Sequence, residues 1–133
     1  MSTTEATRKT VIDYLTAQGA GDGAKMAALL DENVTWTPPA AAGLGAPKGR
    51  AAVLQAMGEA GGKFFDLATM KVDVKWMIAE GDRVAIRTHN ECKAANGRDY
   101  SNEYVWVYRV ANGKIVEIEE HVDSQRFKEI VLD

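Results

Sequence analysis

Three hairpin-type dipeptides in the second half of the chain constrain the fold more than any other sequence feature. Gly81-Asp82, Asn96-Gly97 and Asn112-Gly113 follow one another at nearly even spacing. Dipeptides of this kind form the tight turns that join neighbouring antiparallel strands. Residues 66–123 are therefore predicted to form a meander of four antiparallel strands, each about 10–13 residues long and so longer than usual. Strands of that length twist, so the sheet is expected to curve strongly around whatever covers one face.

The first half of the chain carries helix signals instead. Ser2 followed three residues later by Glu5 is a capping-box pattern, which predicts a helix to about residue 18. Asp22 can cap a second helix ending before residue 33. The remaining expectations are a short β-branched and aromatic strand, an Ala/Gly/Pro-rich loop, a third helix and a closing short helix, at residues 34–37, 40–49, 50–60 and 124–132. The predicted fold class is α+β, with N-terminal helices packed in a curved antiparallel sheet and one domain over residues 1–133.

Composition and charge exclude several classes of function. The formal net charge is −3, whereas nucleic-acid binders need a basic face. No stretch approaches the roughly 18 apolar residues of a membrane span, and the polar first residues lack an apolar signal core. Cys92 is the single cysteine, which rules out an internal disulfide and a four-cysteine zinc site. We expect a cytoplasmic protein that acts on a small molecule or on another protein.

The turns also predict which side chains share a face of the sheet, because two-residue turns determine strand register. One face is then predicted to carry the groups capable of chemistry, in three rows across the strands: Trp76–Arg87–Trp106–Glu119, Val74–His89–Tyr104–His121 and Val72–Glu91–Asn102–Asp123. The other face is predicted to be aliphatic, with Val84, Ile86, Val105, Val107, Val116, Ile118 and Val122.

The polar face has two interpretations. Alternation alone allows a solvated outer face. Trp76 and Trp106 on that face are costly to leave in water, and aromatic groups mixed with a few convergent polar groups are typical of a ligand pocket. If the polar face lines a pocket, the aliphatic face needs its own cover, and a second copy of the chain in a homodimer is the expected partner.

The order helix, helix, short strand, helix and four-strand meander resembles the nuclear transport factor two-like superfamily. That superfamily has a cone-shaped α+β fold and includes SnoaL-like polyketide cyclases, ketosteroid isomerase and limonene-epoxide hydrolase. The resemblance rests on Val11-x-x-Tyr14 with Ala20-Gly21-Asp22, on Asp31-Glu32-x-Val34-x-Trp36 with Gly49-Arg50-x-Ala52-Val53, and on Asn102-x-Tyr104, Asn112-Gly113-Lys114-Ile115 and Glu120-x-x-Asp123. It implies a hydrophobic pocket and chemistry without a cofactor.

The resemblance also implies roles for individual residues. Tyr14 matches the isomerase tyrosine that stabilises an oxyanion, although a core tyrosine is an equal alternative. Thr37 stands where the isomerase has its basic aspartate, which disfavours steroid isomerisation. Arg87, His89 and Asp123 resemble the epoxide hydrolase set with His in place of one Asp, but the hydrolase's Tyr-x-Asn is missing. The cyclases resemble the chain best, and their basic aspartate matches Asp123.

Asp123 is accordingly the predicted general base. A neighbouring carboxylate and partial burial would raise its pKa, as a base that works near neutral pH requires. The alternative is that Asp123 caps the following helix. The other predicted catalytic residues are Arg87, His89 and Tyr104, and the predicted substrate-binding residues are Tyr14, Trp36, Trp76, Glu91, Asn102, Trp106 and His121.

No cofactor and no metal are expected. His89-x-Glu91 and His121-x-Asp123 resemble metal-binding pairs, but their strands would lie about 10 Å apart, too far for one ion. The Ala40–Gly49 stretch lacks the Lys-Ser/Thr ending of a phosphate-binding loop. Two function classes remain: an acid/base enzyme (cyclase, isomerase or hydrolase) acting on a small hydrophobic carbonyl or cyclic compound, and a non-catalytic domain that holds an apolar ligand or partner.

Overall fold

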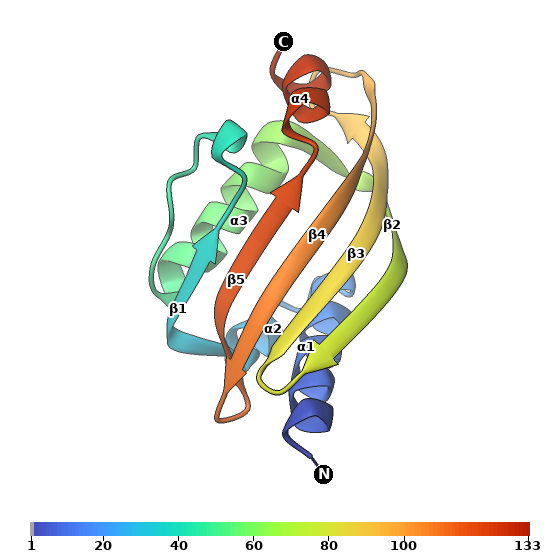
Figure 1. Cartoon of the computed structure of the whole chain (residues 1–133). Helices are drawn as coiled ribbons and strands as arrows, with labels where there is room; N and C mark the ends of the chain where they lie inside the picture. The colour runs from blue at the N-terminus through green and yellow to red at the C-terminus, as the bar shows by residue number, and fades with distance from the viewer. Residues whose placement is uncertain (1) are drawn as a thin grey trace.

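The computed structural model describes residues 2–133 as helices packed on one side of a curved sheet (Figure 1). The helices are α1 (Thr3–Gly19), α2 (Gly23–Leu29), α3 (Arg50–Phe64) and α4 (Ser124–Phe127), with short turns at Ala40–Ala42 and Lys128–Leu132. The strands are β1 (Leu30–Thr37), β2 (Phe65–Glu80), β3 (Arg83–Ala94), β4 (Asp99–Ala111) and β5 (Lys114–Val122), in the sheet order β1-β5-β4-β3-β2. The predicted α+β cone with a curved meander is confirmed. Within residues 2–133 no helix is both long and apolar enough to cross a bilayer.

Both predicted helix caps are present. The Ser2 hydroxyl accepts the N–H of Glu5 at 3.1 Å at the start of α1. The Asp22 carboxylate accepts the N–H of Lys25 at 3.1 Å at the start of α2. Each cap satisfies a backbone donor that the first helical turn leaves free. Local sequence is therefore enough to begin these two helices.

The short strand of the first half is longer than predicted and joins the meander. β1 pairs in parallel with β5, with Trp36 opposite Ile118. This makes the sheet five-stranded and mixed, with β1 at one edge and β2 at the other. Strand order of this kind depends on contacts between distant segments, which no local pattern encodes.

The register predicted for the central hairpin is wrong by one residue. Ala94 donates its N–H to the Arg98 carbonyl at 2.9 Å, so the loop holds three residues rather than two. Gly97, the last of them, has a φ of 86°, which is the left-handed conformation found in three-residue hairpins. As a result every residue of β3 faces a residue of β4 one position away from the predicted partner, and Lys93 faces Asp99.

The other two hairpins begin in the predicted register and then lose it. Glu80 faces Arg83 and Ala111 faces Lys114, as two-residue turns require. β2 has an extra residue between Val74 and Trp76, and β5 has an extra residue between Ile115 and Glu117. Each bulge inserts one residue, and a one-residue slip moves all later side chains to the opposite face.

The three predicted rows across the sheet are therefore wrong. The concave face, which the helices cover, carries the row Val74–Thr88–Tyr104–Val122 and the row Ile86–Trp106–Glu120. The convex face carries the row Trp76–Arg87–Val105–His121 and the pair His89–Glu103. The residues predicted to form one aliphatic face are also divided between the two sides of the sheet. Val84, Ile86 and Ile118 are fully buried in the core, while Val105 and Val107 lie on the convex side.

The core fills the space between the concave face and the helices. Its buried members from the helices include Val11 and Tyr14 of α1 and Val53 of α3. At the end of the cone near α4, four aromatic rings pack edge-to-face or stacked, from Phe64, Phe65, Tyr100 and Phe127. This packing closes one end of the cone and leaves room in the middle.

Candidate functional site

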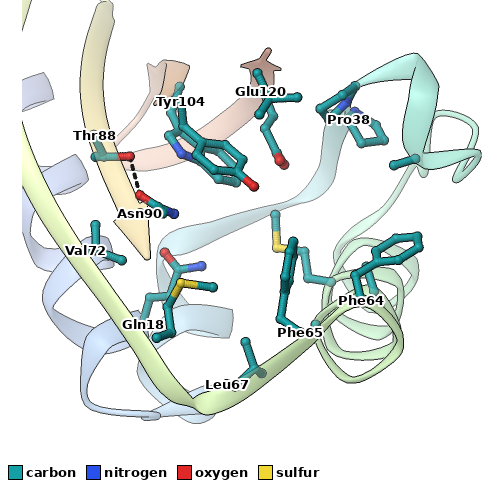
Figure 2. A pocket seen from close by; sticks show the side chains of 18 of the residues that line it. Gln18, Pro38, Phe64, Phe65, Leu67, Val72, Thr88, Asn90, Tyr104 and Glu120 are labelled. Atoms are coloured by element: carbon teal, nitrogen blue, oxygen red, sulfur yellow. Dashed lines mark hydrogen bonds between the residues drawn. The ribbon is translucent and has the colours of Figure 1, made fainter. Parts of the chain in front are cut away.

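A cavity of about 680 Å³ lies between the concave face of the sheet and helices α1 and α3. Figure 2 shows side chains from both sheet and helices converging on it. Its lining is mostly aliphatic and aromatic, with a few polar groups from Gln18, Thr88, Asn90, Tyr104 and Glu120. This composition is typical of a site for a small apolar molecule.

One wall of the cavity is a ladder of aromatic rings on β4. Tyr104, Trp106 and Tyr108 alternate along the strand and so share the concave face. The ring of Trp106 is nearly parallel to those of Tyr104 and Tyr108, at centroid distances of 6.2 and 6.5 Å. Trp36 of β1 adds a further ring. The wall is flat and rigid, which suits a planar ligand.

Glu120 is the only Asp, Glu, His, Lys or Arg side chain among the described residues that line this cavity. It lies on β5 opposite Trp106, between the apolar residues Ile118 and Val122 of the same face. Burial among these groups raises the pKa of Glu120 to about 7, because a carboxylate loses its hydration there. Near neutral pH the side chain therefore exchanges a proton readily.

Trp36 lies beside this carboxyl group. Its indole N–H acts on Glu120 in the opposite direction to burial and lowers the pKa of the carboxyl group. The Nε1 atom nevertheless makes no hydrogen bond of good geometry, and among residues 2–133 it is the one buried side-chain nitrogen or oxygen without a partner. A buried donor without a partner costs free energy, so this N–H is available to the carboxylate or to a bound ligand.

Tyr104 presents a hydroxyl group that is held by a chain of hydrogen bonds. Asn102 Nδ2 donates to the Tyr100 hydroxyl at 2.9 Å, and the hydroxyls of Tyr100 and Tyr104 are 2.9 Å apart. Since the Tyr100 oxygen already accepts from Asn102, its own proton can go to Tyr104, and the Tyr104 proton is then free for the cavity. Burial also raises the pKa of Tyr104 well above its ordinary value, so the hydroxyl stays protonated.

The structure brings some predicted site residues to the cavity and places others elsewhere. Trp36, Tyr104 and Trp106 line it. Asn102 is buried behind Tyr104 and also donates to the Asp123 carbonyl at 3.0 Å. Tyr14 is buried but does not line the cavity, and its hydroxyl donates to Met57 Sδ at 3.7 Å. This contact corresponds to the core-tyrosine alternative.

Five predicted site residues lie on the convex side instead, because of the register slips: Arg87, His89, Glu91, His121 and Trp76. His89 is 2.7 Å from Glu103 through Nδ1 and 3.0 Å from Glu91 through Nε2. These hydrogen bonds with Glu91 and Glu103 raise the pKa of His89. Arg87 Nη2 lies 3.4 Å from Glu103 Oε2 on the same face. The result is an exposed ion-pair network, and Trp76 is 40% exposed beside it.

Asp123 also lies away from the cavity. It precedes α4, and its Oδ1 accepts the N–H of Arg126 at 3.1 Å. That is the helix-capping alternative of the sequence analysis. Asp123 and His89 therefore do not share a cavity, which removes the geometric basis for an acid/base pair between them.

Glu120 lines the cavity, but the sequence pattern did not predict it as a site residue. The signal was present, because Glu120 stands between Ile118 and Val122 at alternate positions, so the three must share a face. Once Ile118 is recognised as core, Glu120 follows as a carboxylate directed into an apolar interior. Among residues 2–133, no group of three or more His, Cys, Asp or Glu side chains is arranged to hold a metal ion.

The sequence profile of the SnoaL-like domain matches residues 11–118. The chain belongs to the SnoaL-like domain family. This agrees with the fold, in which helices enclose an apolar cavity against a curved sheet. No match was found among curated proteins.

Solved structures resemble this SnoaL-like chain over nearly its whole length. An NTF2-like protein of unknown function from Burkholderia pseudomallei is 26% identical, with a TM-score of 0.85 and 100% of both chains covered. Bal32a, from a soil-derived mobile gene cassette, is also 26% identical, with a TM-score of 0.85 and coverage of 98% and 99%. TerC, co-crystallised with polyporic acid, is 18% identical, with a TM-score of 0.82 and coverage of 96% and 99%.

Proposed function

We propose that this SnoaL-like protein is a cofactor-independent acid/base enzyme in which Glu120, rather than Asp123, is the general base. The observation that carries the proposal is a lone carboxyl group in an apolar cavity with a pKa of about 7. A general base works best when its pKa lies near the working pH. The substrate is a small, largely apolar carbonyl compound, which fits the flat aromatic wall.

The proposed reaction is proton transfer at the carbon next to the carbonyl group. The Glu120 carboxylate removes a proton from that carbon, the electron pair of the C–H bond forms a C=C bond, and the carbonyl π electrons move to the oxygen to give an enolate. The Tyr104 hydroxyl, supported by Tyr100 and Asn102, donates a hydrogen bond to that oxygen. The protonated Glu120 then returns its proton to the same or another carbon.

The match to the SnoaL-like family supports the fold on which this proposal depends. TerC was crystallised with polyporic acid, an observation that concerns TerC. Polyketide cyclisation is one form that enolate chemistry takes, and we include it in the proposal as a subclass. Epoxide hydrolysis by Arg87, His89 and Asp123 receives no support, because none of the three lines the cavity. A cytoplasmic location is a part of the proposal that rests on the sequence alone. The expected homodimer loses its argument, because Val84, Ile86 and Ile118 of the aliphatic face are buried in the core of the same chain.

Deuterium exchange into 2-tetralone tests the proposal, because this ketone is small, flat and acidic next to its carbonyl. In D₂O the wild-type protein should accelerate the loss of the α-proton signals in NMR spectra. Glu120→Gln should slow the exchange by about a hundredfold or more. Glu119→Gln is the matched control, since Glu119 is adjacent in sequence but lies opposite Val107 on the convex face.

Two results would contradict the proposal. Equal exchange by wild type and Glu120→Gln would remove Glu120 as the base. Binding of 2-tetralone without any acceleration of exchange would favour the second function class, a non-catalytic domain that holds an apolar ligand.

A further inference from the structure

Thr88 and Asn90 form a polar pair in the cavity that the proposed proton transfer does not use. Both line the cavity from the concave face of β3. Thr88 is buried, and its Oγ1 donates to Asn90 Oδ1 at 2.7 Å. The surrounding lining on this side is apolar, from Leu67, Val72 and Val74. Burying two polar side chains in apolar surroundings costs free energy, which a polar ligand group could offset.

The hydrogen bond leaves the amide of Asn90 with a definite orientation. Because Oδ1 accepts from Thr88, the NH₂ group is directed away from Thr88, and Figure 2 shows it on the cavity side. Among residues 2–133, Asn90 Nδ2 makes no side-chain hydrogen bond, whereas Asn96 and Asn102 both donate through Nδ2. An amide NH₂ is a donor only, so the group matches an acceptor oxygen.

We propose that Thr88 and Asn90 form a subsite for an acceptor oxygen, a carbonyl or ether, at the end of the ligand remote from its reacting carbon. The inference rests on the proposed function for the position of the reacting carbon at Glu120. Strand β4 separates β3 from β5, and the β4 partners of Asn90 and Glu120 are Asn102 and Trp106, four residues apart. Two strand spacings and four residues along the strand place the backbones that carry Asn90 and Glu120 roughly 16 Å apart. The substrate class is thus an elongated apolar ketone with a second oxygen at its far end. Asn90 binds that oxygen, and Thr88 is a positioning residue that orients the amide.

A matched pair of ketones tests the subsite. 6-Methoxy-2-tetralone and 6-ethyl-2-tetralone have nearly the same shape, but only the first carries an acceptor oxygen at the far end. Calorimetric titration of the wild-type protein should show about threefold to tenfold tighter binding of the methoxy compound, the size of one net hydrogen bond. In titrations at pH 9, Asn90→Leu and the isosteric Asn90→Asp should both abolish this preference, because leucine has no donor and an ionised aspartate has none either.

Two further variants separate the roles of the neighbouring groups. Thr88→Val should reduce the preference while leaving binding of the ethyl compound unchanged, since the amide loses the bond that orients it. Gln18→Leu is the control, because Gln18 is the other amide that lines the cavity. Thermal unfolding of each variant checks that it is folded. If Asn90→Leu does not fold, Asn90→Asp alone tests the subsite.

The inference is overturned if wild type binds both ketones equally, if it binds neither, if the preference survives in Asn90→Asp, or if Gln18→Leu is the variant that loses it. Its failure is distinct from failure of the proposed function. If only the subsite is wrong, Glu120-dependent exchange into 2-tetralone remains intact. If only the proposed function is wrong, exchange is absent but the methoxy preference and its dependence on Asn90 remain.

Discussion

Neighbouring carboxylates on β5 show how strongly position controls chemistry at the scale of a single residue. Glu119 and Glu120 are adjacent and identical in type, yet Glu119 lies on the convex face near His121 while Glu120 faces the aromatic wall of the cavity. The burial of Glu120 raises its pKa to about 7. Desolvation is the largest cause of this raised pKa, because apolar side chains enclose the Glu120 carboxyl group.

The raised pKa of Glu120 makes stability depend on pH. The carboxyl pKa rises from an ordinary value of 4.5 to about 7 on folding, so the folded state holds the proton over a range in which the unfolded chain has lost it. Stability therefore falls as pH rises between these values. Glu120→Gln avoids ionisation and should be more stable than wild type at pH 8, by on the order of 3 kcal/mol at most.

Urea unfolding of both proteins at pH 5 and pH 8 measures this effect. The advantage of Glu120→Gln should grow as pH rises. A constant difference across this pH range would contradict the raised pKa.

Trp36 should influence the same titration. Its N–H faces the Glu120 carboxyl group and lowers the pKa of that group. Trp36→Phe keeps a ring but removes the donor, so the pKa of Glu120 should rise and the midpoint of the pH–exchange profile for 2-tetralone should move to higher pH. An unchanged midpoint would show that the indole N–H does not act on Glu120.

At the scale of the element, turns and bulges decide which side chains enter the cavity. The dipeptides at residues 81–82, 96–97 and 112–113 correctly predict three hairpins. One of them uses a three-residue loop, and bulges in β2 and β5 shift the register further. Each shift moves a whole strand segment to the other face, which is why His89 and Arg87 lie outside while Thr88 lies inside.

The junction of β5 and α4 gives a test at this scale. Asp123→Ala removes the acceptor for the Arg126 N–H and should lower the free energy of unfolding by about 1 kcal/mol, the usual cost of a lost N-cap. Asp123→Asn should retain the stability, since asparagine also caps helices. Both variants should retain exchange into 2-tetralone. Loss of exchange in Asp123→Asn, with stability unchanged, would restore Asp123 as a candidate base.

At the scale of the whole molecule, the helices turn one face of the sheet into a cavity. α1 and α3 cover the concave face (Figure 1), and the rings of Phe64, Phe65, Tyr100 and Phe127 pack together at the end near α4. Val74 lines the cavity yet is 51% exposed, so it lies where the cavity meets solvent. Entry of ligand past β2 follows from this arrangement.

Substitution at this opening tests the route. Val74→Trp should obstruct the opening and slow the association of 2-tetralone roughly tenfold or more, with a change in stability within about 0.5 kcal/mol because the site is exposed. Ile78→Trp is the control, since Ile78 is an exposed position of the same strand that does not line the cavity. Equal association rates in stopped-flow binding for Val74→Trp and wild type would place the route elsewhere.

The sequence by itself determined the local features: the helix caps at Ser2 and Asp22, the three hairpins, and the order of helices and strands that resembles the SnoaL-like fold. These features depend on contacts between residues a few positions apart, so the sequence pattern predicts them. The tertiary structure alone decided the site. Loop length, bulges and the pairing of β1 with β5 arise from twisting and packing over long separations, and they selected Glu120, Thr88 and Asn90 for the cavity while leaving Asp123 as a helix cap.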